Sequence, residues 1–168
     1  MKTVFQGKLY TIKQGETKEE TGERADRCPS IGVIPFTKEG KVILTREYRK
    51  EVGKKVISTV WGRVDKESDI ETAAHRELAE EAKFKAKKMK LFYKAKPEDT
   101  LTWDRYMFVA TGLEPTKAEA DEDEDIEPFE CTLNEACEYA LTDFRQEIMA
   151  YTLLKLRHDL ETGKFKLP

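Results

Sequence analysis

Three glutamates near the middle of the 168-residue sequence could bind a metal ion together. Glu77, Glu80 and Glu81 are spaced i, i+3 and i+4, so a helix would place their carboxylates on one face, where like charges repel. A hard divalent cation reverses that repulsion, because Mg²⁺ prefers oxygen ligands and is commonly held by carboxylates together with substrate phosphates. The spacing therefore indicates a metal site for a phosphate compound. The solvated face of a surface helix would explain the same acids.

The residues before this cluster favour the metal site. Upstream lie four apolar, strand-like residues, Val56, Ile57, Val60 and Trp61, and Gly62 follows them, where a glycine lets backbone approach the ligands closely. Ser68 and Glu71 have the S-x-x-E form of a capping box, so we expect a helix over residues 69–82. Strand, glycine, polar turn and acidic helix thus follow one another in the order that a site at the end of a strand needs.

These residues resemble the signature of the Nudix hydrolase family. That signature has a glycine, a glutamate, the run R-E-(apolar)-x-E-E and a closing glycine at fixed spacing. Gly62 and residues 76–81, which read R-E-L-A-E-E, stand at matching positions. Ser68 replaces the first glutamate, with Glu67 beside it, and Lys83 replaces the closing glycine. Since the family's metal ligands lie mainly in the R-E-x-x-E-E run, metal binding is the property that these two departures threaten least.

The resemblance implies a role for each residue of the run. Glu77, Glu80 and Glu81 would hold Mg²⁺, or Mn²⁺ in its place, and the backbone carbonyl of Trp61 would join them as a ligand. Glu77 and Glu81 therefore count among the expected catalytic residues. Arg76 would keep the carboxylates in register.

The N-terminal half resembles the ADP-ribose and ADP-sugar pyrophosphatase branch of that family, through V-F-Q-G-K-L-Y, S-I-G-V-I-P-F and V-I-L-T-R-E-Y-R. That branch favours an arginine where Arg49 stands. Its N-terminal β-extension commonly crosses to a partner subunit and helps to line the adenine pocket, which implies a homodimer. Phe5 and Tyr10 would then stack on a base, although packing within a hairpin or a dimer explains both aromatics at least as well.

A second acidic run, residues 121–127, follows the expected strand at residues 106–110. Most such runs are solvated loops. In the pyrophosphatase branch, however, an acidic loop often carries a glutamate that faces the metals and activates water, and Glu124, then Glu122, are the candidates here. An EF-hand fits poorly, because Ile126 occupies the place of its turn glycine.

Arg105 lies next to Trp103 and Tyr106 and is a candidate for substrate binding. Its planar guanidinium could bind a phosphate or stack on a base. An ordinary salt bridge at a strand end is the alternative, and it ranks slightly above substrate binding.

Composition fits one enzyme-sized domain. The sequence has 30 Lys and Arg against 33 Asp and Glu, which gives a net charge of −3, so bulk charge does not favour binding to nucleic acid.

No apolar run is long enough for a membrane span, and the first residues lack the apolar core of a secretory signal, so we expect a cytoplasmic protein. Cys28, Cys131 and Cys137 lack C-x-x-C spacing and indicate reduced thiols.

Strands and helices mix along the chain instead of repeating as βα units. The expected fold is α/β (α+β), a Nudix-like α/β/α sandwich with a mixed sheet and an N-terminal β-hairpin extension. Residues 1–27 would form that extension and residues 28–168 the catalytic domain. The expected elements are a hairpin at residues 4–12, a polar loop at 15–27, strands at 31–36, 42–46, 56–61, 89–94, 106–110 and 126–131, and helices at 69–82, 134–141 and 144–160.

The family resemblance implies a Mg²⁺-dependent Nudix pyrophosphohydrolase. Its substrate would be a nucleoside diphosphate linked to another moiety, foremost ADP-ribose or an ADP-sugar, split into AMP and a sugar phosphate. Nucleoside triphosphates are an alternative substrate. Ser68 and Lys83 motivate a further alternative, a catalytically weakened nucleotide-binding or regulatory protein. A calcium-binding or purely structural acidic protein ranks last.

Overall fold

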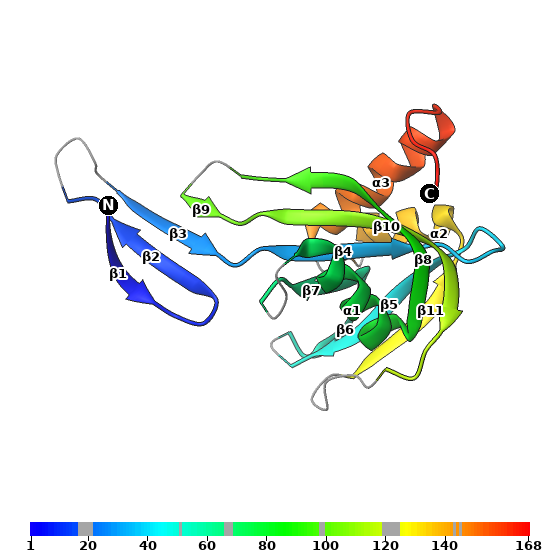
Figure 1. Cartoon of the computed structure of the whole chain (residues 1–168), viewed down its shortest axis with the longest axis horizontal. Coiled ribbons are helices and arrows are strands. Elements are labelled where there is room, and N and C mark those ends of the chain that lie inside the picture. Colours follow the sequence, from blue (N-terminus) through cyan, green and yellow to red (C-terminus); the bar gives the residue numbers. More distant parts are fainter. Residues whose placement is uncertain are drawn as a thin grey trace.

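The computed structural model describes residues 1–16, 22–50, 52–65, 69–97, 100–118, 125–142, 144 and 146–168 (Figure 1). In chain order the elements are β1 (Lys2–Gln6), β2 (Tyr10–Gln14), β3 (Glu23–Arg27), β4 (Ser30–Pro35), β5 (Val42–Arg49), β6 (Lys54–Ser58), β7 (Val60–Arg63), α1 (Ile70–Ala82), β8 (Phe84–Ala95), β9 (Leu101–Thr102), β10 (Arg105–Pro115), β11 (Ile126–Cys131), α2 (Leu133–Thr142) and α3 (Glu147–Glu161).

Side chains that alternate along the central strands place helices on both faces of the fold. Along β4, Ile31 and Val33 pack in the core that α1 covers, whereas Ile34 packs in the core that α2 and α3 cover. β5 divides in the same way, with Ile43 in the first core and Leu44 in the second. The expected sandwich of helices around sheets is therefore confirmed. α1 covers one face, and α2 and α3 cover the other.

The sheets are mixed, as expected. One has the order β7-β4-β10-β8, in which β10 runs parallel to β4 and antiparallel to β8. A second sheet has the order β11-β5-β6. The expected single strand at residues 56–61 is divided at Thr59 between the two sheets, because β6 pairs with β5 whereas β7 pairs with β4. This division brings β7 next to α1.

Helix α1 begins one residue later than the capping box predicted. Asp69 is the N-cap, and its Oδ1 accepts hydrogen bonds from the backbone N–H groups of Glu71, at 3.1 Å, and Thr72, at 2.8 Å. Ser68, the expected cap, lies outside the described residues. The helix ends at Ala82, and its C-cap Lys83 has a left-handed backbone and donates its N–H to the carbonyl of Leu78.

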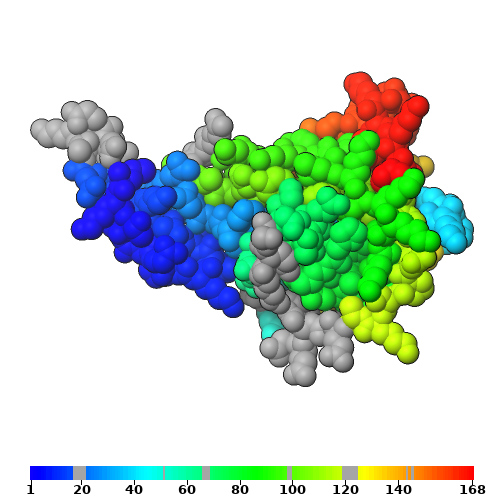
Figure 2. All heavy atoms as spheres, viewed as in Figure 1, coloured from blue at the N-terminus to red at the C-terminus, as the bar shows by residue number. Residues whose placement is uncertain are grey.

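A separate sheet, β1-β2-β3-β9, forms the N-terminal extension. The hairpin of β1 and β2 is present as expected, but residues 23–27 of the expected polar loop form β3. β1 is exposed at every residue, and none of the described residues among 1–27 is buried. Figures 1 and 2 show this blue hairpin projecting from one end of the molecule, away from α1.

Short or poorly buried elements account for the remaining differences. β9 has two residues and pairs with β3, so it joins the extension to the rest of the fold, and the domain boundary at residue 27 stays a prediction. α3 starts at Glu147 instead of residue 144, because Phe144 forms an isolated β-bridge with Ile57. Among the described residues, no helix is both long and apolar enough to cross a membrane.

Candidate functional site

Gly62 of β7 packs directly against Glu77 of α1. Glu77 is only 9% exposed, and its carboxyl group lies against the backbone of Gly62. A Cβ atom at Gly62 would be 1.9 Å from both Cδ and Oε1 of Glu77. Only glycine therefore lets this carboxylate occupy its place at the edge of the sheet.

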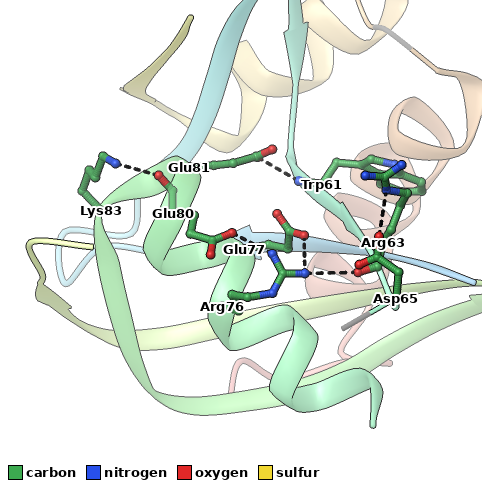
Figure 3. A network of polar contacts seen from close by, with 8 residues as sticks. All are labelled: Trp61, Arg63, Asp65, Arg76, Glu77, Glu80, Glu81 and Lys83. Carbon is green, nitrogen blue, oxygen red and sulfur yellow. Dashed lines mark hydrogen bonds and ion pairs between the residues drawn. The ribbon is translucent and has the colours of Figure 1, made fainter. Parts of the chain in front are cut away.

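Arg76 forms ion pairs with two of the three glutamates (Figure 3). Its Nη2 lies 2.8 Å from Oε1 of Glu77, and its Nη1 donates to Oε2 of Glu80 at 2.7 Å. Nη2 also donates to the backbone carbonyl of Arg63 at 3.3 Å. One guanidinium thus offsets the repulsion between the carboxylates and connects α1 to the end of β7.

Glu81 contacts β7 through the residue before Gly62. Its Oε2 accepts the backbone N–H of Trp61 at 3.0 Å, and both residues are buried. The Trp61 indole packs edge-on against Trp103, with ring centroids 6.1 Å apart, and Trp103 Nε1 donates to Oγ of Ser30 at 3.0 Å. Glu81 therefore connects α1 to the residue of β7 whose indole packs on Trp103.

The chemistry of these side chains fits a hard divalent cation, since the glutamates offer only oxygen. Within the described part of the chain, no three His, Cys, Asp or Glu side chains are grouped so as to hold a metal ion. Instead, Glu77 and Glu80 contact Arg76, while Glu81 contacts the Trp61 amide. A cation at these carboxylates has to compete with donors from the protein itself.

The expected substrate-binding residues do not all lie near the glutamates. Arg49, at the end of β5, pairs with Glu47 at 3.1 Å. Phe5 is 57% exposed on β1, and Tyr10 begins β2, so both belong to the hairpin that projects away from α1 (Figure 1). Within one chain, the structure therefore does not bring these two aromatics and the glutamates together.

Arg105 stacks on Trp103, with its guanidinium carbon 4.9 Å from a ring centroid. Arg27, which the sequence did not single out, lies 3.9 Å from a Trp103 ring centroid and 5.4 Å from the ring of Tyr10. The Nε atoms of both arginines are buried without a hydrogen-bond partner among the described residues. Arg27 comes from β3, inside the expected loop, so no periodic signal could have revealed it.

The expected general bases, Glu124 and Glu122, lie outside the described residues. The described residues on either side of this gap are Ala118 and Asp125, and the carbonyl of Asp125 accepts the backbone N–H of Tyr48 at 3.3 Å. Lys83 contacts Ala118 and is a further residue whose contacts the sequence did not reveal.

Cys131 and Cys137 do not form a second reactive centre. Burial raises the pKa of the Cys131 thiol to about 11 and also raises the pKa of Cys137. A thiol with a raised pKa stays protonated near neutral pH and is a poor nucleophile. Both side chains pack in the core beneath α2 and α3.

Comparison with known proteins places the chain in a family. The Nudix domain profile matches residues 26–152. The chain is 27% identical over 147 residues to the methanol dehydrogenase activator of Bacillus methanolicus, covering 81% of this chain and 78% of that protein. It is 29% identical over 144 residues to the ADP-ribose pyrophosphatase of Bacillus subtilis (strain 168), covering 79% and 76%.

A solved structure has the same fold. It is a crystal structure of an ADP compounds hydrolase, which superposes with a TM-score of 0.79 at 23% identity and covers 96% of this chain and 92% of that one. The profile match spans most of the sequence, including β7, α1 and all the residues that resemble the family signature. The chain belongs to the Nudix family.

Proposed function

We propose that the protein hydrolyses the diphosphate of ADP-ribose or a related ADP-sugar to AMP and a sugar phosphate, with Mg²⁺ as its cofactor. The contact between Glu77 and Gly62 is the observation that carries the proposal, because it fixes a carboxylate of the acidic helix at the end of β7. The similarity to an ADP-ribose pyrophosphatase supports the choice of substrate.

In this mechanism Glu77, Glu80 and Glu81 hold the cation, and the backbone carbonyl of Trp61 is a further ligand. When bound, Mg²⁺, or Mn²⁺ in its place, supplies charge neutralisation at the diphosphate and makes a bound water more acidic. Arg76 keeps the glutamates in register through its ion pairs with Glu77 and Glu80.

The remaining steps fall to residues outside α1. Glu124, or Glu122 in its place, accepts a proton from the attacking water. Arg105 binds a phosphate or the base of the substrate, because its Nε has no hydrogen-bond partner among the described residues. Arg49 serves as a second substrate-binding cation at the end of β5.

The substrate site is completed in a homodimer. Val4 and Phe5 are 52% and 57% exposed on β1, a strand that pairs only with β2 among the described residues. Apolar side chains on an unpaired edge strand favour association with another surface. The hairpin thus reaches a second copy of the chain, where Phe5 and Tyr10 contact the substrate base.

A product assay tests the function. We would incubate the protein with ADP-ribose, ADP-glucose, other nucleotide-sugars, dinucleotides and nucleoside triphosphates, with Mg²⁺ or with chelator, and separate the products by chromatography. We expect AMP and ribose 5-phosphate from ADP-ribose only when Mg²⁺ is present.

A matched pair of variants tests the residues. Glu81→Gln should lower turnover by more than the roughly 10- to 100-fold that loss of an outer-shell partner of a metal costs. Glu71→Gln, an exposed change in the first turn of the same helix, should leave turnover unchanged. Intact Mg²⁺-dependent turnover in Glu81→Gln would contradict the proposed metal site.

A regulatory role is the second candidate, favoured by the similarity to a protein named as an activator of methanol dehydrogenase. A protein of this kind would bind nucleotide through the same residues without turnover. Saturable binding of ADP-ribose with no product from any compound would favour this role over the hydrolase.

A further inference from the structure

Trp103 lies where the N-terminal extension meets the rest of the fold. It follows β9, which pairs with β3 of the extension, and it precedes β10, an inner strand of the sheet β7-β4-β10-β8 (Figure 1). Its side chain is only 9% exposed and packs in a core cluster with Trp61, Met107, Ile148 and Met149. This one ring therefore touches both the buried core and the junction with the extension.

Two contacts fix the plane of the Trp103 indole. Its Nε1 donates to Oγ of Ser30, a fully buried residue of β4, at 3.0 Å. The ring also packs nearly perpendicular to that of Trp61, with an interplanar angle of 85°. A hydrogen bond at the ring edge and an aromatic contact in the core both restrict rotation of the side chain. Trp103 therefore presents its ring to other groups in a defined orientation.

Two guanidinium groups stack on this ring. The guanidinium carbon of Arg27, from β3, lies 3.9 Å from a Trp103 ring centroid, and that of Arg105, from β10, lies 4.9 Å from one. Tryptophan is the best aromatic partner for a cation, and the attraction grows where water is excluded. The Nε atoms of both arginines are buried and have no hydrogen-bond partner among the described residues. The indole therefore contributes to the orientation of both guanidinium groups.

The carboxylate next to each arginine in the sequence is bonded to other groups. Asp26, beside Arg27, pairs with two cations of the extension. Asp104, beside Arg105, accepts the hydroxyl of Tyr106 at 3.2 Å. Stacking on Trp103 is thus the contact that positions the two guanidinium groups.

We propose that Trp103 is a positioning residue with two effects. It holds the guanidinium of Arg105 in place for the substrate, and it fixes β3 of the extension to the core through Arg27. The first effect rests on the proposed function, in which Arg105 binds a phosphate or the base of the substrate. The second effect is independent of that function, because it concerns the attachment of one strand.

Substrate affinity tests the first effect. Trp103→Met removes the ring and keeps an adaptable apolar side chain in the core, whereas Trp103→Phe keeps a ring. For ADP-ribose hydrolysis we expect KM to rise about three- to tenfold in Trp103→Met, with kcat little changed, and to stay near the wild-type value in Trp103→Phe. Equal KM values in the two variants would show that the ring face has no role.

A double variant tests whether Trp103 acts through Arg105. Arg105→Met should raise KM at least as much as Trp103→Met, because it removes the guanidinium itself. Adding Trp103→Met to Arg105→Met should cause no further rise, since residues that act through one contact are not additive. Wild-type KM in Trp103→Met, or two increases that multiply in the double variant, would overturn the first effect.

Ser30→Ala replaces Trp103→Met if that variant does not fold. It removes the hydrogen bond that orients the indole and leaves the ring in place. We expect a smaller rise in KM, which Arg105→Met again abolishes in the double variant. Wild-type KM in Ser30→Ala would then overturn the first effect.

Hydrogen–deuterium exchange tests the second effect without any substrate. The backbone N–H of Ala25 donates to the carbonyl of Thr100 at 2.7 Å, so its exchange reports how firmly β3 is held to the chain around β9. It should exchange faster in Arg27→Met and in Trp103→Met than in the wild type, and no faster in the double variant than in Trp103→Met alone. Unchanged exchange in both single variants would overturn the second effect.

Arg46→Met is the matched control. The guanidinium carbon of Arg46 lies 3.8 Å from the ring centroid of Phe129, so this variant removes a comparable contact in the separate sheet β11-β5-β6. It should change neither KM nor the exchange of the Ala25 amide.

The two effects can fail separately. If the wild type hydrolyses none of the compounds, the proposed function fails and the first effect fails with it. Exchange at Ala25 still decides the second effect in that case, because it needs neither metal nor substrate.

Discussion

Gly62 shows how one residue without a side chain determines where a functional group can lie. An added Cβ would lie 1.9 Å from the Glu77 carboxyl group, so any other residue at position 62 requires Glu77 to move. We expect Gly62→Ala to push Glu77 away from β7, to lower the free energy of unfolding by about 1–3 kcal/mol and to abolish most of the metal-dependent turnover. Urea unfolding and the ADP-ribose assay measure the two effects.

Gly163→Ala is the matched control for that variant. Gly163 has φ of 69° and nothing within 4 Å of an added Cβ, so alanine there adds only the backbone cost. We expect a loss of roughly 1 kcal/mol in stability and normal turnover. If Gly62→Ala behaves like Gly163→Ala, the contact with Glu77 has no functional role.

Thiol chemistry distinguishes the three cysteines. Burial raises the pKa of Cys131 to about 11 and raises that of Cys137, whereas Cys28 is half-buried. At pH 8 an aromatic disulfide reagent should therefore label Cys28 in the native protein and all three after unfolding. Mass spectrometry of the labelled peptides locates the modification. Fast native labelling of Cys131 would show that its core opens readily.

At the scale of elements, α1 depends on its N-cap as well as on its packing. Backbone N–H donation from Thr72, then the Thr72 hydroxyl, lowers the pKa of Asp69. The ionised cap therefore adds stability above the pKa of an unfolded Asp, about 3.9, and this contribution is lost as the pH falls through the lower folded value. The wild type should thus lose stability relative to Asp69→Asn as the solution is acidified.

Urea unfolding between neutral and acidic pH measures that difference. Asparagine is a good N-cap and does not titrate, so the two proteins should be close in stability at neutral pH. Glu71→Gln is the control in the same helical turn. A constant difference between wild type and Asp69→Asn at all pH values would show that the carboxylate of Asp69 does not stabilise the helix through its charge.

Elements with a strong periodic pattern could be predicted from the sequence, and contacts between distant segments could not. The alternating strands around Ile31 and Leu44 and the acidic helix were found because each signal lies within a few residues. β9 was missed because its two residues depend on pairing with β3. The bond from Lys83 to Ala118 was missed for the same reason, since it joins residues 35 positions apart.

The candidate site shows the same difference between local signals and contacts that join distant segments. Local spacing was enough to select the glutamates of α1 and the glycine of β7. The stacking of Arg27 and Arg105 on Trp103 could not be seen, because β3, β9 and β10 meet only in the folded chain. Residue types indicated the chemistry. The order of the strands determined which arginine side chains stack on the Trp103 ring.

For the whole molecule, the exposed hairpin leads to a prediction about assembly. Phe5→Asp should convert a dimer into a monomer, because a charge would have to be buried among apolar side chains. Leu141→Asp, at a position 65% exposed on α2, should leave the mass unchanged. Light scattering after size-exclusion chromatography measures both. A wild-type monomer at all concentrations would contradict the proposed dimer.

The packed pair of tryptophans gives the protein a built-in optical reporter. The sequence has two tryptophans, and these are Trp61 and Trp103, packed edge to face. The Trp61 amide is bonded to Glu81, so a cation that draws this carboxylate away alters the surroundings of an indole. Ultraviolet emission of the unlabelled protein can therefore follow occupancy of the site, with little background from elsewhere in the fold.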